Sequence, residues 1–135
     1  MRLVVHVDGG SRGNPGPAAG AAVLSTPEGD VVDEAAETLG ETTNNVAEYR
    51  ALLLGVRRAR ELGATEIELV NDSELIAKQL TGAYKVKHAA MKPLHLEAIA
   101  ALRDFDAWSI RTVPRAQNAA ADALVNQALD GLKGL

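Results

Sequence analysis

Residues 7–17, VDGGSRGNPGP, decide how this chain folds. The segment that leads into them, residues 2–8, alternates apolar and polar positions, so Leu3 and Val7 are expected on one face of a strand. Asp8 comes last in this alternation and closes the predicted strand. The glycines and prolines that follow it predict a turn. The pattern therefore predicts a strand that delivers a carboxylate to the edge of a sheet, next to a glycine-rich turn.

The rest of the sequence predicts an order of elements typical of an α/β protein. Three strands joined by short turns come first and favour an antiparallel meander, whereas the later alternation of strands and helices favours parallel crossovers. Together they predict a mixed sheet with helices packed on it, in a single domain over residues 1–135. The predicted strands are 2–8, 18–25, 31–40, 66–71 and 108–113, and the predicted helices are 44–62, 73–80, 91–102 and 119–132.

The composition excludes several classes of protein. Of the 135 residues, 24 are alanine and only four are aromatic, which predicts a tightly packed aliphatic core. The absence of cysteine excludes disulfides, thiolate metal sites and cysteine nucleophiles, and it fits a reducing compartment. No apolar run approaches the ~20 residues of a membrane span, and a carboxylate at position 8 comes too early for a secretory signal peptide. We therefore expect a cytoplasmic protein with no membrane partner.

Four carboxylates occupy positions that a structural role explains only in part. Asp8 ends a predicted strand, where a turn aspartate is the alternative. Glu48 shares a helix face with apolar residues, although Asn45, three residues earlier, is at the spacing of a capping box. Asp72 precedes a helix that it could cap, and Asp122 lies beside the apolar stripe of the last helix, where a boundary residue is the alternative.

A compact mixed sheet would bring Asp8, Glu48 and Asp72 to one edge, and Asp122 reaches the same edge if the last helix packs back across the sheet. Two unit charges ~4 Å apart repel by about 4 kcal/mol at an effective dielectric constant of roughly 20, so four cannot stay ionised together without cations. Oxygen ligands with no cysteine and few histidines favour magnesium or manganese over zinc. Two magnesium ions in an acidic cluster suit phosphodiester hydrolysis, since one activates water and the other stabilises the leaving oxygen.

Four motifs together resemble type I ribonuclease H over about residues 2–130. They are VDGGSRGNPGP at 7–17, TNNVAEY at 43–49, NDS at 71–73, and Asn118 with Asp122. The resemblance implies a five-stranded mixed sheet with helices on both faces. It also implies an endonuclease that hydrolyses the RNA strand of RNA–DNA hybrids, with water attacking the phosphodiester to leave 5′-phosphate and 3′-hydroxyl ends.

The resemblance further implies four catalytic acids that hold two Mg²⁺ ions, with Mn²⁺ as a substitute. Asp8 would bridge both ions. Glu48 and Asp72 would complete one metal site, and Asp122 the other.

A substrate surface is implied around the glycine-rich turn and the start of the helix 44–62. Glycines leave room for a sugar-phosphate backbone, and asparagine side chains can read 2′-hydroxyls and base edges in the minor groove. The helix N-terminus beside Thr43 is a natural binding site for a phosphate group. Turn and cap chemistry is the alternative for the asparagines. The residues assigned to substrate binding are Gly9, Gly10, Ser11, Asn14, Thr43, Asn44, Asn45 and Arg115.

The chain departs from many family members before its last acid and in its basic segment. The loop 114–118 has no histidine and follows a Pro-Arg-x-x-Asn-x-x-x-Asp pattern, in which Arg115 either contacts the scissile phosphate, helps product release or is simply solvated. Residues 80–93 are a short segment with lysines and Tyr84 where some relatives hold a basic protrusion, so weaker hybrid binding is expected. Glu41 stands where a positive charge would help to seat a DNA phosphate.

The sequence leaves several alternatives open. One is an enzyme with the same fold whose substrate is double-stranded RNA or DNA instead of a hybrid. A hybrid-binding module without turnover is the non-enzymatic alternative, against which the presence of all four acids argues. The net charge of −4 means that any nucleic acid must bind through local patches. We expect a monomer, either a whole protein or one domain of a longer parent with a further C-terminal domain.

Overall fold

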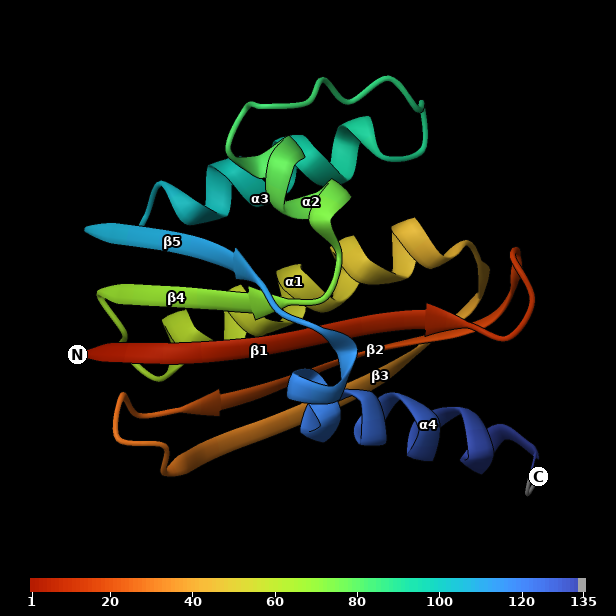
Figure 1. Cartoon of the computed structure of the whole chain (residues 1–135), viewed down its shortest axis with the longest axis horizontal. Helices are drawn as coiled ribbons and strands as arrows, with labels where there is room; N and C mark the ends of the chain where they lie inside the picture. The colour runs from red at the N-terminus through yellow and green to blue at the C-terminus, as the bar shows by residue number, and fades with distance from the viewer. Residues whose placement is uncertain (134–135) are drawn as a thin grey trace.

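The computed structural model describes residues 1–133, which form a five-stranded sheet and four α-helices (Figure 1). A short 3-10 helix, η1 (Arg115–Asn118), precedes the last α-helix. The strands are β1 (Arg2–Ser11), β2 (Gly16–Ser25), β3 (Val31–Thr42), β4 (Glu66–Asn71) and β5 (Ala107–Thr112). The α-helices are α1 (Asn44–Glu61), α2 (Glu74–Leu80), α3 (Lys92–Leu102) and α4 (Ala119–Lys133).

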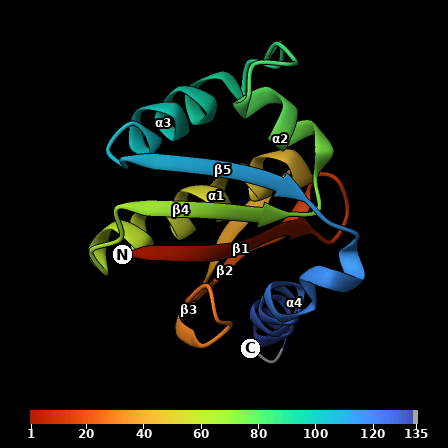
Figure 2. The ribbon, with the colours of Figure 1, turned by 60° about the vertical axis from the view of Figure 1, so that its left-hand side comes forward.

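The sheet is mixed and has the strand order β3-β2-β1-β4-β5. β1, β2 and β3 form an antiparallel meander, β4 is parallel to β1, and β5 is parallel to β4. α1, with α2 and α3 beside it, covers one face, and α4 packs on the other (Figure 2). The predicted α/β class, the mixed five-stranded sheet and the helices on both faces are confirmed. Across residues 1–133, no helix is both long and apolar enough to cross a membrane.

Small side chains let helices press closely on both faces of the sheet. On one face, Val5 of β1 is fully buried against α1, and a Cβ added at Gly55 of that helix would lie 2.7 Å from Val5 Cγ1. On the other face, Ala21 of β2 packs with Val125 and Leu129 of α4. The aliphatic, alanine-rich core expected from the composition therefore fills both helix–sheet interfaces.

β1 is longer than the sequence pattern predicts. The strand does not end at Asp8 but continues to Ser11, because residues 9–11 pair with residues 18–20 of β2. This ladder of main-chain hydrogen bonds overrides the local turn preference of the glycines. The pairing of β1 with β4 ends earlier, at His6. Asp8 therefore lies inside β1, two residues beyond the last residue that pairs with β4.

Two further boundaries differ from the prediction. β3 runs two residues beyond the predicted end and reaches Thr42, which pairs with Gly16 at the start of β2. The segment 114–118, for which the sequence pattern predicts no helix, contains η1. Both extensions lie near the glycine-rich turn or the last acid, where tertiary pairing decides the backbone conformation.

Gly9 faces α1, and its replacement by alanine should be costly. A Cβ there would lie 2.2 Å from the Ala47 carbonyl oxygen, so helix backbone would have to move. We expect Gly9→Ala to lower the free energy of unfolding by roughly 3 kcal/mol, as overpacking does. Gly10→Ala is the matched control, because a Cβ at Gly10 would meet only Val125 Cγ1, at 4.0 Å. Urea denaturation of both variants is the measurement, and equal stabilities would contradict the prediction.

Candidate active site

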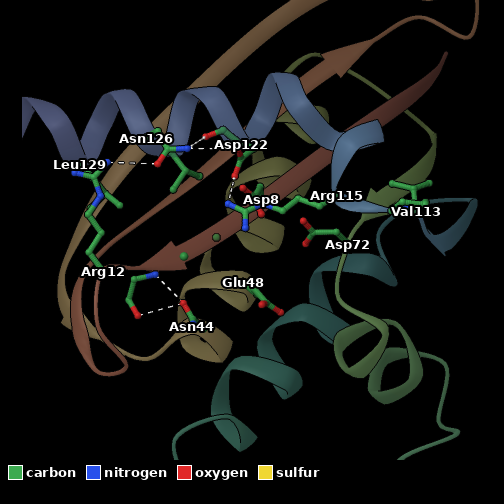
Figure 3. A pocket seen from close by; sticks show the side chains of 15 residues that line it. Asp8, Arg12, Asn44, Glu48, Asp72, Val113, Arg115, Asp122, Asn126 and Leu129 are labelled. Carbon is green, nitrogen blue, oxygen red and sulfur yellow. Dashed lines mark hydrogen bonds and ion pairs between the residues drawn. The ribbon is translucent and has the colours of Figure 1, made fainter.

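A cavity of about 560 Å³ opens beside the place where β1 and β4 separate (Figure 3). Each of the four predicted acids lines it, and each comes from a different part of the fold. Asp8 belongs to β1, Glu48 to α1 and Asp122 to α4, and Asp72 directly follows β4. Because α1 and α4 cover opposite faces of the sheet, the acids reach the cavity from both sides.

The capping alternatives for Glu48 and Asp72 are wrong. The N-cap of α1 is Thr43, whose hydroxyl accepts a hydrogen bond from the Val46 amide at 3.3 Å, so Glu48 lies beyond the capped turn. The N-cap of α2 is Ser73 and not its neighbour Asp72. Neither carboxylate is needed to begin a helix.

Burial and mutual repulsion raise the pKa values of three of the acids. Asp8 is only 9% exposed, and burial, followed by the negative charges of Asp72 and Asp122, raises its pKa to about 8, against the opposing charge of Arg115. Burial also raises the pKa of Glu48 and that of Asp72. The fold thus holds these groups where they resist ionising together, and a cation in the cavity would relieve the repulsion.

The side chains fit a hard divalent cation. All four donors are carboxylates, which magnesium and manganese prefer as ligands. Glu48 Oε2 is buried without a hydrogen-bond partner among the described residues, and such an atom needs a cation or a donor to offset its desolvation. As the side chains stand, no group of three or more acidic or histidine residues within 1–133 is already arranged to hold an ion.

Arg115 brings a positive charge to the acids. Its Nη2 lies 3.0 Å from Asp122 Oδ1, and its side chain is 76% exposed, whereas that of Asp122 is 27% exposed. Arg115 begins η1 directly after Pro114 and reaches the cavity from its rim. An exposed ion pair of this kind contributes about 0–1 kcal/mol, so a cation can displace it at little cost.

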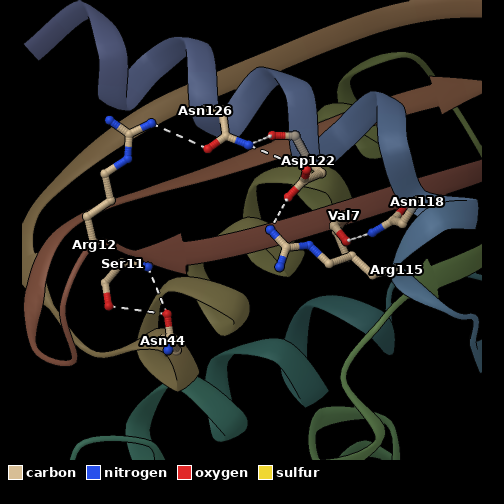
Figure 4. A network of polar contacts seen from close by, with 8 residues as sticks. All are labelled: Val7, Ser11, Arg12, Asn44, Arg115, Asn118, Asp122 and Asn126. Atoms are coloured by element: carbon tan, nitrogen blue, oxygen red, sulfur yellow. Dashed lines mark hydrogen bonds and ion pairs between the residues drawn. The ribbon is translucent and has the colours of Figure 1, made fainter.

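Asn118 fastens the start of α4 to β1. Its Nδ2 donates a hydrogen bond to the Val7 carbonyl oxygen at 2.8 Å, and the residue is 1% exposed (Figure 4). Val7 precedes Asp8, and Asn118 lies four residues before Asp122. The hydrogen bond therefore holds the backbones that carry these two acids against each other, which is a mechanical reason for the motif that joins Asn118 to Asp122.

The eight residues assigned to substrate binding fall into two groups. Turn and cap chemistry, the alternative for the asparagines, does occur: Asn44 Oδ1 accepts from the Ser11 amide at 2.8 Å, and Asn14 Oδ1 accepts from the Asn44 amide at 3.1 Å. Their contact with nucleic acid stays a prediction. Five of the eight line the cavity, namely Gly9, Gly10, Ser11, Asn44 and Arg115, whereas Asn14, Thr43 and Asn45 are not among its lining residues.

The reason predicted for glycine at position 9 is wrong. Space for a sugar-phosphate backbone was the expected reason, but the missing side chain of Gly9 makes room for the backbone of α1 at Ala47. Gly10, which has open space around it, is the glycine whose missing side chain can leave room for a substrate.

Two polar residues of the cavity, Arg12 and Asn126, are absent from the predicted site. Arg12 Nη2 lies 2.8 Å from Asp130 Oδ1, and Asn126 Nδ2 lies 3.4 Å from Asp122 Oδ2. The signal for Asn126 in the sequence is its spacing of four residues from Asp122, which places both on one helix face. The signal for Arg12 is a cation inside a glycine-rich turn.

The raised pKa of Asp8 predicts how stability depends on pH. A carboxyl whose pKa is about 8 in the folded state, and lower in the unfolded state, binds more protons when folded, so the free energy of unfolding falls as pH rises from about 4 to about 8. We expect this group to contribute up to about 1.4 kcal/mol per pH unit. Asp8→Asn should reduce the slope. Urea unfolding with a chelator, between about pH 5 and pH 8, tests this, and an unchanged slope would refute it.

Comparison with known proteins extends over nearly the whole chain. Residues 6–128 match the model of the reverse transcriptase-like family. The chain is 47% identical over 129 residues to ribonuclease HI of Halobacterium salinarum, a match that covers 96% of this chain and 65% of that protein. The crystal structure of RNase H1 from the same archaeon has a TM-score of 0.95 at 46% identity, covering 97% of this chain and 99% of that one.

Two further relatives also match this chain over nearly its whole length. The bifunctional protein Rv2228c of Mycobacterium tuberculosis is 45% identical over 131 residues, which are 96% of this chain but 36% of that protein. LC11-RNase H1, solved in complex with an RNA/DNA hybrid, has a TM-score of 0.92 at 37% identity, covering 96% of this chain and 98% of that one. The chain thus spans less than two thirds of the length of the archaeal and mycobacterial proteins. From the family model and these matches, the chain belongs to the type I ribonuclease H family.

Proposed function

We propose that this chain is an endonuclease that hydrolyses the RNA strand of RNA–DNA hybrids with the help of divalent metal ions. The observation that carries the proposal is one cavity lined by Asp8, Glu48, Asp72 and Asp122, four carboxylates that come from different parts of the fold. The relatives named as ribonucleases H, one of them crystallised with an RNA/DNA hybrid, support the same substrate.

Each acid has a role that its environment supports. Asp8 is affected by the charges of both Asp72 and Asp122, and it would contribute to both metal positions. Glu48 and Asp72 would complete one position, and Asp122 the other. Two Mg²⁺ ions, or Mn²⁺ as a substitute, would supply activation of water and neutralisation of the leaving oxygen, giving 5′-phosphate and 3′-hydroxyl ends.

The basic and amide groups at the rim would orient the hybrid. Because Asn44 Oδ1 already accepts from Ser11, its Nδ2 is the group left to donate to a 2′-hydroxyl or a base edge. Gly10 leaves room for the sugar-phosphate backbone on the same side of the cavity. Arg115, once released from Asp122, would be free to contact the scissile phosphate.

We also propose that the domain acts as a cytoplasmic monomer and, in a longer parent, beside another domain. The match of this chain to only 36% of a protein named bifunctional supports the second part. Neither part changes the chemistry inferred for the cavity.

Asp72→Asn should reduce kcat/KM for a labelled hybrid by more than about 100-fold, because several kcal/mol of charge stabilisation depend on the acids. The substitution keeps the side-chain size and removes repulsion on Asp8, so the metal-free variant should be at least as stable as the parent protein. Asp106→Asn, at an exposed turn, is the control. Gel assays with and without Mg²⁺ and urea curves measure both effects. A normal cleavage rate would remove Asp72 from the site.

The substrate preference is testable with three labelled duplexes offered side by side: hybrid, double-stranded RNA and DNA. We expect cleavage of the RNA strand of the hybrid to be the fastest. Hybrid binding should also weaken as salt rises, because phosphate contacts release counterions. Equal cleavage of double-stranded RNA would argue against hybrid specificity, and affinity independent of salt would exclude binding through phosphate contacts.

A further inference from the structure

Polar side chains lie along one face of α4 beside the cavity, and Figure 4 shows two of them, Asp122 and Asn126. Asp122, Asn126 and Asp130 recur every four residues and therefore share one face of the helix. Arg12, from the turn between β1 and β2, reaches across to this face. Its Nη2 lies 2.8 Å from Asp130 Oδ1 and 3.4 Å from Asn126 Oδ1.

These contacts fix which end of the Asn126 amide faces the acids. A guanidinium has only donors, so it binds the carbonyl oxygen of an asparagine and turns the NH₂ group away. The Asn126 NH₂ then points to Asp122, where Nδ2 lies 3.1 Å from the backbone oxygen and 3.4 Å from Oδ2. The opposite orientation would place the amide oxygen against these acceptors and the NH₂ group against the guanidinium, so Arg12 adds to the preference that Asp122 itself imposes.

Asp122 is consequently held at both of its carboxylate oxygens. Arg115 donates to Oδ1, and Asn126 donates to Oδ2. Arg115 is exposed and its pair is easily broken, as argued above. If Arg115 leaves, the hydrogen bond from Asn126 still restricts rotation of the carboxylate.

Arg12 itself is held by a turn that has little freedom. Its backbone N–H donates to the Pro17 carbonyl oxygen at 2.8 Å, which closes the turn. The neighbouring Ser11 is bonded to Asn44 at the start of α1. A Cβ at Gly16 would lie 2.1 Å from the Arg12 carbonyl oxygen, so the turn is closely packed. The guanidinium is therefore presented to α4 from a fixed base.

We propose that Asn126 is a positioning residue for Asp122 and that Arg12 acts through it by fixing the orientation of its amide. The inference rests on the proposed function, because it concerns how an acid of that site is aimed. It also connects the turn that is expected to contact substrate with the acid on the opposite side of the cavity. Neither residue needs to touch the reacting phosphate.

The test uses Asn126→Ala, Arg12→Ala and the double variant, with Gln127→Ala on an exposed position of α4 as the control. Mn²⁺ binding without substrate is measured by calorimetry, and kcat and KM are measured on a labelled hybrid. We expect Asn126→Ala to weaken Mn²⁺ binding by roughly 10-fold, as loss of a hydrogen bond to a ligand does. At subsaturating Mn²⁺, kcat should fall, while KM for the hybrid stays within about twofold of the parent value.

Comparison of the single variants with the double variant tests whether Arg12 acts through Asn126. Arg12→Ala should weaken Mn²⁺ binding in the same direction, and the double variant should be no worse than Asn126→Ala alone, because both act through one amide. Gln127→Ala should match the parent protein. Melting temperatures of the metal-free variants report whether each one is folded.

Three results would overturn the inference. They are unchanged Mn²⁺ binding in Asn126→Ala, multiplicative effects in the double variant, and a higher KM for the hybrid with normal Mn²⁺ binding in Arg12→Ala. The last of these would make Arg12 a direct phosphate contact. Failure of the parent protein to cleave any hybrid would instead refute the proposed function, and Mn²⁺ binding by the variants would still decide the role of Asn126.

Discussion

Repulsion among carboxylates drawn into one cavity is the constraint on which the rest of this structure depends. Asp8 shows it most clearly, since burial and the charges of Asp72 and Asp122 raise its pKa to about 8. A chain selected only for stability would not place these groups together. The surrounding fold must therefore hold the acids in place against their own electrostatics, and it does so with contacts to the backbone of β1.

Two such contacts act on β1. Gly9 brings one face of the strand against the backbone of α1 at Ala47, next to Glu48. The buried Asn118 donates to the Val7 carbonyl oxygen, a main-chain acceptor of the same strand, and holds the segment that leads to Asp122. Because β4 leaves β1 after His6, the strand between these contacts has a free side on which the acids can meet.

The sequence was sufficient to predict the elements and the gathering of four acids in one place, but not the contacts that join them. Helical periodicity revealed that Glu48 faces inward, and the alternation around Asp8 revealed its strand. The extension of β1 to Ser11 depends on pairing with β2, which local turn propensity cannot report. The role of Gly9 depends on a helix almost 40 residues later in the chain, and the contact between Arg12 and Asn126 joins positions 114 residues apart. Side-chain partners at such separations follow from the topology of the fold, and local sequence patterns do not predict them.

The charge at Asp122 and the position of its backbone depend on two residues of very different exposure, Arg115 and Asn118, and this difference would suit a site that exchanges cations. Arg115 is exposed and sits on η1 at the rim, so its pair with Asp122 can break without disturbing the core. Asn118, at the other end of the same four-residue segment, is buried and bonded to β1. Separating the two functions allows the charge at Asp122 to be replaced while the backbone that carries Asp122 stays fixed. A single residue that provided both would have to break the packing of α4 each time the charge moved.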